Sequence, residues 1–167
     1  MEGKKGLITG GLGFIGSNLA RKCVKLGAKV TIFDCLDPRS GGNLYNIADI
    51  AETVQVSYHN ILDFDQVSQV VPEKDIIFSC ASSTSHAFSM REPWIDLDVN
   101  TKGVINLLEA VRRFNPNVKF VHLGTSTQLG KLHYEPSDEN HPEFPRDIYS
   151  ANKSVSEKYV LIYCQAH

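Results

Sequence analysis

Tyr149 and Lys153 lie four residues apart in the run Tyr-Ser-Ala-Asn-Lys. Side chains at this spacing share one face of a helix, so the phenol and the ammonium can meet. A positive charge close to a phenol favours its ionised form, which makes the tyrosine a candidate acid or base at neutral pH. The same spacing is common on solvated helix faces, so the pair indicates a site only if the rest of the chain supplies one.

A glycine-rich turn follows the first apolar run. The segment Gly-Gly-Leu-Gly-Phe-Ile-Gly, residues 10–16, leads directly into a predicted helix. Glycines let a backbone approach a pyrophosphate, and a helix N-terminus offers free N–H groups and a partial positive charge. Two registers fit a dinucleotide-binding turn, one beginning at Gly10 and one at Gly11, and the spacing does not choose between them.

Asp34 closes the second apolar run, at the distance from the glycines where an acid accepts hydrogen bonds from an adenosine ribose. A carboxylate there would repel a phosphate on the ribose, so the sequence favours NAD over NADP. Arg39, in the loop that follows, could hold such a phosphate. The preference for NAD is therefore an expectation that this arginine leaves open.

Five apolar runs of strand length alternate with stretches of helical periodicity, and this order predicts one α/β domain over residues 1–167. Buried apolar strands joined by helices indicate a doubly wound parallel sheet of the Rossmann type. The predicted strands are residues 6–9, 29–33, 54–58, 76–80 and 119–123. The predicted helices are residues 14–26, a weak one ending near 51, a short one from Asp63 to before Pro72, one long helix over 94–114, and a last one holding Tyr149 and Lys153. Residues 130–147 are polar and proline-containing, which predicts a surface loop.

The bulk composition excludes several classes of protein. Seventeen basic and nineteen acidic residues give a formal charge of -2 without a basic face, so no nucleic-acid or membrane partner is expected. No apolar run approaches the roughly 18 residues of a membrane span, and a cytoplasmic protein is expected. The four cysteines and six histidines do not group at ligand spacing, so no metal is expected. The cysteines are interpreted as reduced packing residues and His122 as a core residue with satisfied hydrogen bonds.

With the glycine turn, Asp34 and Tyr149-x-x-x-Lys153 in this order, the chain resembles the extended short-chain dehydrogenase/reductase family. It is most similar to the NAD-dependent nucleotide-sugar epimerases and dehydratases, over nearly its whole length. The resemblance implies the register Gly10-x-x-Gly13-x-x-Gly16 and a set of cofactor-binding residues. These are Gly10, Gly13, Phe14, Ile15, Gly16, Asp34, Asn60, Ile61, Cys80, Ala81, Ser82, Asn100, Tyr149 and Lys153. Asn60 departs from the family's aspartate beside the adenine, but it keeps a side-chain acceptor.

The resemblance also implies a third catalytic residue. The segment from Thr125 to Gly130 is similar to the family's Ser/Thr-x-x-x-x-Gly pattern, which makes Thr125 the hydroxyl that would hold the sugar oxygen deprotonated by Tyr149. The same hydroxyls could instead only satisfy backbone groups after the strand. The 4,6-dehydratases of the family carry Asp and Glu at the next two positions, where this chain has Ser126 and Thr127. Their absence favours an epimerase.

The implied activity is that of a 4-epimerase-like enzyme, in which a sugar hydroxyl is transiently oxidised by bound NAD with Tyr149 as base and Lys153 as its partner. Family members add a C-terminal lobe that binds the nucleotide-sugar, so we expect this chain to be the cofactor-binding fragment, ending after the helix of Lys153, with the substrate lobe absent and little turnover of its own. The full-length protein is expected to bind a nucleotide-sugar and is a possible homodimer. The alternatives are a dehydratase or NAD-dependent oxidoreductase of the same family and a nonenzymatic dinucleotide-sensing module.

Overall fold

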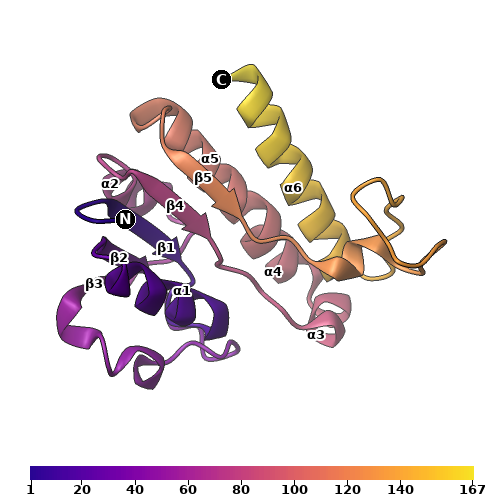
Figure 1. The fold of residues 1–167 in the computed structure, drawn as a ribbon. Helices are drawn as coiled ribbons and strands as arrows, with labels where there is room; N and C mark the ends of the chain where they lie inside the picture. Colours follow the sequence, from indigo (N-terminus) through magenta and orange to yellow (C-terminus); the bar gives the residue numbers. More distant parts are fainter.

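Five parallel strands form one sheet in the order β3-β2-β1-β4-β5. The computed structural model describes all 167 residues, and Figure 1 shows the strands side by side between two layers of helices. The strands are β1 (Lys5–Thr9), β2 (Lys29–Phe33), β3 (Val54–Ser57), β4 (Ile76–Ser79) and β5 (Lys119–His122). This confirms the predicted doubly wound α/β fold. β2 has the predicted bounds, whereas β1 begins one residue earlier and β3, β4 and β5 end one residue earlier than predicted.

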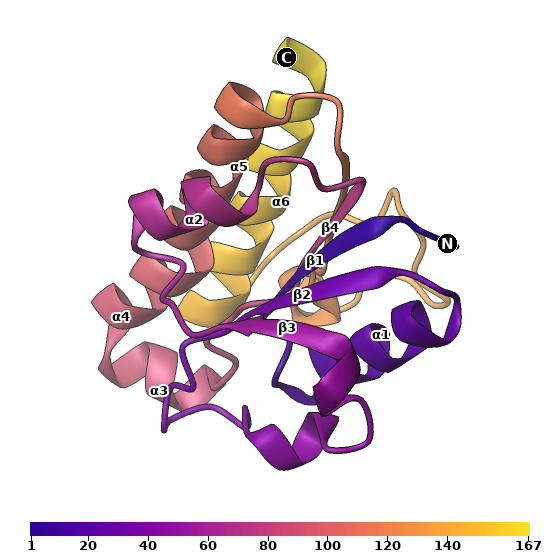
Figure 2. The same cartoon turned by 90° about the vertical axis from the view of Figure 1, so that its left-hand side faces the viewer.

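Successive residues of each central strand point to opposite faces of the sheet, and each face has its own core. Ile8 of β1 belongs to the core under α1 (Phe14–Lys25). Ile47 and Ile50 join this core from a segment that forms two short 3-10 turns, Leu44–Ile47 and Ala51–Thr53. These two turns replace the weak helix that the sequence predicted. Leu7 belongs to the opposite core. Figure 2 shows that α1 lies on one side of the sheet and the other long helices lie on the other side.

The second layer contains α2 (Phe64–Val70) and α5 (Gly103–Phe114), whose apolar residues pack on β1 and β4. Asp63 caps α2 by accepting a hydrogen bond from the backbone N–H of Gln66 at 3.2 Å, as the sequence predicts. Covering helices on both faces leave only the ends of the sheet open to a ligand.

The predicted long helix over residues 94–114 is confirmed as one unbroken helical run over residues 93–114, but it contains a π-helical turn that the sequence did not indicate. The run consists of α4 (Pro93–Leu97), a π-helical turn (Asp98–Lys102) and α5, and an unpredicted helix α3 (His86–Arg91) precedes it. Glu92 separates α3 from α4 with a non-helical backbone, φ -126° and ψ 63°, since the residue before a proline is disfavoured in the helical region.

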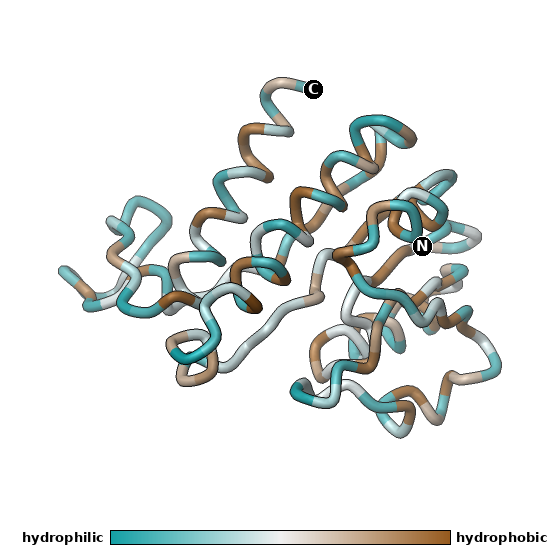
Figure 3. Tube along the Cα trace, turned by 180° about the vertical axis from the view of Figure 1, so that it is seen from behind, coloured by the Kyte–Doolittle hydropathy of each residue, from teal (hydrophilic) through white to brown (hydrophobic).

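The last helix, α6 (Ile148–Ala166), lies beside α5 and begins over α3 (Figure 1). The predicted surface loop precedes it, and Figure 3 shows that this loop is largely hydrophilic. The loop nevertheless folds around a buried side chain, because Nε2 of His141 accepts a hydrogen bond from the backbone N–H of His133 at 2.9 Å. None of the helices combines the length and the apolar character needed to span a lipid bilayer.

Two interpretations of single side chains are wrong. Cys23 is buried and Cys80 is half-buried, but Cys35 and Cys164 are exposed and do not pack in a core. Nδ1 of His122 lies 3.3 Å from the Ser79 hydroxyl, whereas its buried Nε2 has no hydrogen-bond partner. Residue type and spacing do not report whether another element covers a side chain or supplies its hydrogen-bond partner.

Candidate functional site

A cleft of about 800 Å³ opens at the carboxyl ends of the strands. It lies where β1 and β4 leave the sheet in opposite directions, the position at which doubly wound sheets bind ligands. The predicted cofactor-binding residues line this cleft with three exceptions, which are Asn100, Tyr149 and Lys153. Residues from four separate segments of the sequence therefore meet at one surface.

The glycine turn forms one wall of the cleft, and its glycines have different reasons to be glycine. Gly10 has φ +65°, and a Cβ there would lie 2.7 Å from the Cα of Ala81. A Cβ on Gly16 would overlap the carbonyl of Gly10. Gly13 has an ordinary φ of -77°, and its nearest obstacle is the Gly10 carbonyl at 3.3 Å. The fold therefore requires Gly10 and Gly16, whereas Gly13 leaves a backbone surface at the start of α1 that an anionic ligand can approach.

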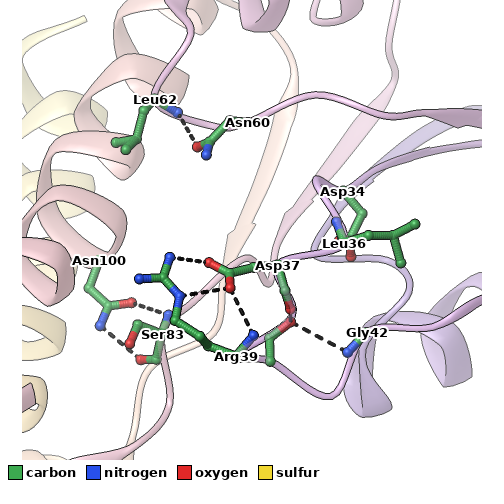
Figure 4. Close-up of polar contacts among 10 residues, drawn as sticks. Asp34, Leu36, Asp37, Arg39, Gly42, Asn60, Leu62, Ser83 and Asn100 are labelled. Carbon is green, nitrogen blue, oxygen red and sulfur yellow. Dashed lines mark hydrogen bonds and ion pairs between the residues drawn. The ribbon is translucent and has the colours of Figure 1, made fainter. Parts of the chain in front are cut away.

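Asp34 lies in the second wall of the cleft, where it joins the loop after β2 to the glycine turn. Its two carboxylate oxygens accept the backbone N–H groups of Leu12, at 3.0 Å, and of Leu36, at 2.9 Å. Each oxygen keeps a further lone pair for a ligand hydroxyl. Asn60 lies further along the cleft, where its side-chain oxygen accepts the N–H of Leu62 at 3.0 Å (Figure 4). Ribose hydroxyls and an adenine ring fit the donors and acceptors that these residues leave free, and the glycine turn fits a pyrophosphate.

Asn100 is buried in the π-helical turn and fixes the segment that follows β4. Its side-chain oxygen accepts hydrogen bonds from the hydroxyl of Ser82, at 2.7 Å, and the N–H of Ser83, at 3.0 Å. Its side-chain amide donates to the carbonyl of Ser83 at 2.9 Å. Figure 4 shows this contact beside the side chain of Arg39. Asn100 therefore positions the floor of the cleft and does not line it.

Tyr149 and Lys153 lie in the first two turns of α6, and both are buried. The Lys153 ammonium donates to the carbonyl of Leu123 at 2.5 Å. Burial lowers the pKa of Lys153 to about 8. Burial also raises the pKa of Cys80 to about 12 and, with the nearby Lys153 charge, lowers the pKa of His122 to about 4. Both neighbours are therefore neutral at pH 7, and of these three groups Lys153 has the pKa closest to that pH.

A chain of hydroxyl groups links the predicted Thr125 to the helix of Tyr149. The hydroxyl of Ser150 donates to Thr127 Oγ1 at 2.8 Å, and Thr127 Oγ1 lies 3.0 Å from Thr125 Oγ1. Ser150 is fully buried and follows Tyr149 directly. The structure thus brings Thr125 and the start of α6 together through Thr127.

Sequence analysis did not find the contact between α3 and Tyr149. The His86 ring meets the Tyr149 ring edge to face, with centroids 4.8 Å apart, and His86 Nδ1 lies 2.8 Å from a carboxylate oxygen of Asp147. The other Asp147 oxygen accepts the N–H of Ser150 and caps α6. Ser85, which caps α3 by accepting the N–H of Phe88, was the one sequence signal that could have indicated this helix.

The class of protein follows from where the cleft lies. A 3-2-1-4-5 parallel sheet with a glycine turn after β1 and an acid after β2 is a Rossmann-type dinucleotide-binding domain. Residues 7–167 match the GDP-mannose 4,6 dehydratase family. The chain belongs to the NAD-dependent nucleotide-sugar epimerases and dehydratases of the extended short-chain dehydrogenase/reductase family.

The relatives include epimerases, dehydratases and a decarboxylase. A putative UDP-glucose 4-epimerase of Methanocaldococcus jannaschii is 33% identical over 159 residues, which cover 94% of this chain and 50% of that protein. A dTDP-glucose 4,6-dehydratase of Mycobacterium tuberculosis is 31% identical over 168 residues, 96% of this chain and 49% of that protein.

The crystal structure of the Thermus thermophilus UDP-glucose 4-epimerase complex with NAD has a TM-score of 0.86 at 28% identity, covering 97% of this chain and 51% of that one. The chain thus spans about half the length of the relatives it matches, and a relative of known structure binds NAD.

Proposed function

We propose that this chain is the NAD-binding part of a nucleotide-sugar epimerase in which Thr125, Tyr149 and Lys153 handle the proton. The observation that carries this proposal is the row of hydroxyls from Ser150 through Thr127 to Thr125, adjoining Tyr149. The Thr127 hydroxyl is hydrogen-bonded to Ser150 and lies against Thr125, so its proposed role is to orient the Thr125 hydroxyl. The dehydratases carry carboxyl groups at the two positions after the Thr125 hydroxyl, and this chain has neutral side chains there.

Either hydroxyl can donate in the contact between Thr125 and Thr127, and the proposal takes Thr127 as the donor. Thr127 Oγ1 accepts from Ser150, so its own hydrogen is available to Thr125. Thr125 then keeps its hydrogen for a sugar oxygen, which it would hold in place for deprotonation.

Tyr149 is the base in this proposal. A sugar hydroxyl would lose its proton to Tyr149, with Lys153 as the neighbouring cation one helical turn away. Bound NAD would supply the hydride acceptor. Gly13 and the start of α1 would hold the pyrophosphate, and Asp34 the ribose of the adenosine. Nucleotide-sugars are the proposed substrates because the names of the relatives specify them.

Two measurements test the proposal. This chain should bind NAD in isothermal titration calorimetry. The natural protein that carries the sequence should convert a nucleotide-sugar to its isomer without releasing NADH, and Tyr149→Phe should abolish the conversion. Turnover of Tyr149→Phe within a few fold of the parent protein would contradict the assignment of the base.

The same assay separates the alternatives. A dehydratase, which the matched family description supports, would give a product lighter by one water. An oxidoreductase would release NADH, and a sensing module would bind NAD and leave every nucleotide-sugar unchanged.

A further inference from the structure

We propose that Asp37 selects NAD over NADP by holding Arg39 in an ion pair that keeps its guanidinium away from a phosphate on the adenosine ribose. This inference rests on the proposed function, because it concerns the cofactor of that same site. It assigns a specificity role to Asp37, a residue in which the sequence showed no function. It also resolves the ambiguity that Arg39 introduced.

Both carboxylate oxygens of Asp37 accept hydrogen bonds from the Arg39 guanidinium. Arg39 Nε donates to Asp37 Oδ1 at 2.8 Å, and Nη2 donates to Asp37 Oδ2 at 2.5 Å. This two-point arrangement fixes the plane of the guanidinium as well as its position. The backbone N–H of Arg39 also donates to Asp37 Oδ1, at 2.9 Å. The carboxylate is therefore built into the turn and does not depend on a chance meeting of two long side chains.

A second contact holds the guanidinium across the cleft. Its central carbon lies 5.6 Å from the centre of the Phe88 ring, on α3, in the range of a cation–π interaction. Asp37, Arg39 and Phe88 all line the cleft. Figure 4 shows the pair between Asp34 on one side and Ser83 on the other. The loop after β2 thus places a neutralised arginine beside the acid that is proposed to hold the ribose.

The charges explain the expected selectivity. Asp34, Asp37 and Arg39 together carry a formal charge of minus one, so a phosphate entering beside Asp34 meets net repulsion. Loss of the Asp37 charge would remove the only carboxylate within ion-pair distance of Arg39, and the weaker influence of the Glu92 charge would remain. Arginine binds phosphate through the same paired donors that Asp37 now occupies. NAD lacks that phosphate, so its affinity should change little.

The test measures dissociation constants of this chain for NAD and NADP by isothermal titration calorimetry. Asp37→Asn keeps an oxygen for the N–H of Arg39 and removes the charge. It should tighten NADP binding by about tenfold and change NAD binding by less than about twofold. The double variant Asp37→Asn/Arg39→Gln should return to the parent's discrimination, since the gain is assigned to the released guanidinium.

Asp49→Asn is the matched control. Asp49 binds Arg21 by the same two-point geometry, Nε to Oδ2 at 2.6 Å and Nη2 to Oδ1 at 2.9 Å, and neither residue lines the cleft. The Asp49→Asn variant has the same change of net charge as Asp37→Asn, and it should leave the affinities for NAD and NADP unaltered. A melting curve of each variant confirms that it is folded, and Asp37→Ser provides a second removal of the charge.

Each outcome has a defined meaning. Equal tightening of NAD and NADP by Asp37→Asn, an unchanged NADP affinity in both Asp37 variants, a gain that survives in the double variant, or an equal gain in Asp49→Asn would each overturn the inference. Absence of NAD binding by the unmodified chain would instead overturn the proposed function.

Discussion

The ammonium of Lys153 is buried against the carbonyl oxygen of Leu123, 2.5 Å away, so α6 is tied to the end of β5 by a charged hydrogen bond. The contact satisfies one donor but supplies no compensating negative charge. Burial accordingly lowers the pKa of Lys153 from 10.5 to about 8. The free energy of unfolding, measured as a function of pH, should reveal the titration of Lys153.

Lys153→Met should alter how stability depends on pH. Between about pH 8 and 10.5 the unfolded lysine keeps its proton while the folded one has lost it, so the unfolded state binds more protons and stability rises with pH. The unmodified chain should therefore gain up to roughly 3 kcal/mol relative to the variant across this window. Urea unfolding at a series of pH values measures the difference. Lys131→Met, in the exposed loop, is the control, and a difference that stays flat with pH would contradict the shifted pKa.

Thr127→Val should weaken catalysis and stability together. The substitution keeps the shape of the side chain and removes the hydroxyl that joins Ser150 to Thr125. Stability should fall by about 1 kcal/mol because the buried Ser150 hydroxyl loses its acceptor, and turnover of the natural protein should fall by about tenfold because Thr125 loses its orientation. Ser126→Ala, at an exposed position, is the control. Equal activity of the two variants would show that the row of hydroxyls has no role in the reaction.

The sheet and the cofactor wall were predictable because both depend on local patterns. Apolar runs such as β2 and the glycine turn with Asp34 act through neighbours in sequence, and parallel pairing then brings their carboxyl ends together. The π-helical turn inside the long helix was missed because the helix continues through it, with apolar residues at helical spacing on both sides.

The contacts between distant segments could not be predicted in the same way. His86 and Tyr149 lie 63 positions apart in the sequence, and only the packing of α3 on α6 brings them together. The contact of Arg39 with Phe88 has the same origin. Residue type indicated that Arg39 could hold a phosphate, but its partners were set by the fold.

Asp147 should show two separable effects, one on the helix cap and one on charge. Asp147→Ala removes the acceptor of the Ser150 N–H and should cost about 1 kcal/mol of stability, whereas Asp147→Asn keeps an acceptor and should cost less.

The effect of charge is visible in the pH dependence. Burial opposes ionisation of Asp147, but hydrogen bonds from Ser150 and His86 outweigh it and lower the pKa of the carboxyl. Because the folded pKa lies below the unfolded value, this contribution is present above the unfolded pKa and is lost as pH falls through the folded pKa. Urea unfolding of both variants from neutral to acid pH measures it. A constant difference between the parent and Asp147→Asn would contradict the paired state of the carboxylate.

Gly13→Ala should separate cofactor binding from folding. The position has an ordinary backbone conformation, and the new methyl group would meet only the Gly10 carbonyl at 3.3 Å, so the expected loss of stability is about 1 kcal/mol or less. The methyl group would stand on the backbone that a pyrophosphate must approach, and NAD affinity should fall by at least about tenfold. Gly41→Ala, in the same cleft but with open space around its Cβ, should leave both quantities unchanged.

Titration calorimetry and urea unfolding of the two variants provide the comparison. Parental NAD affinity in a folded Gly13→Ala variant would remove the start of α1 from the binding site and require the pyrophosphate to lie elsewhere along the cleft.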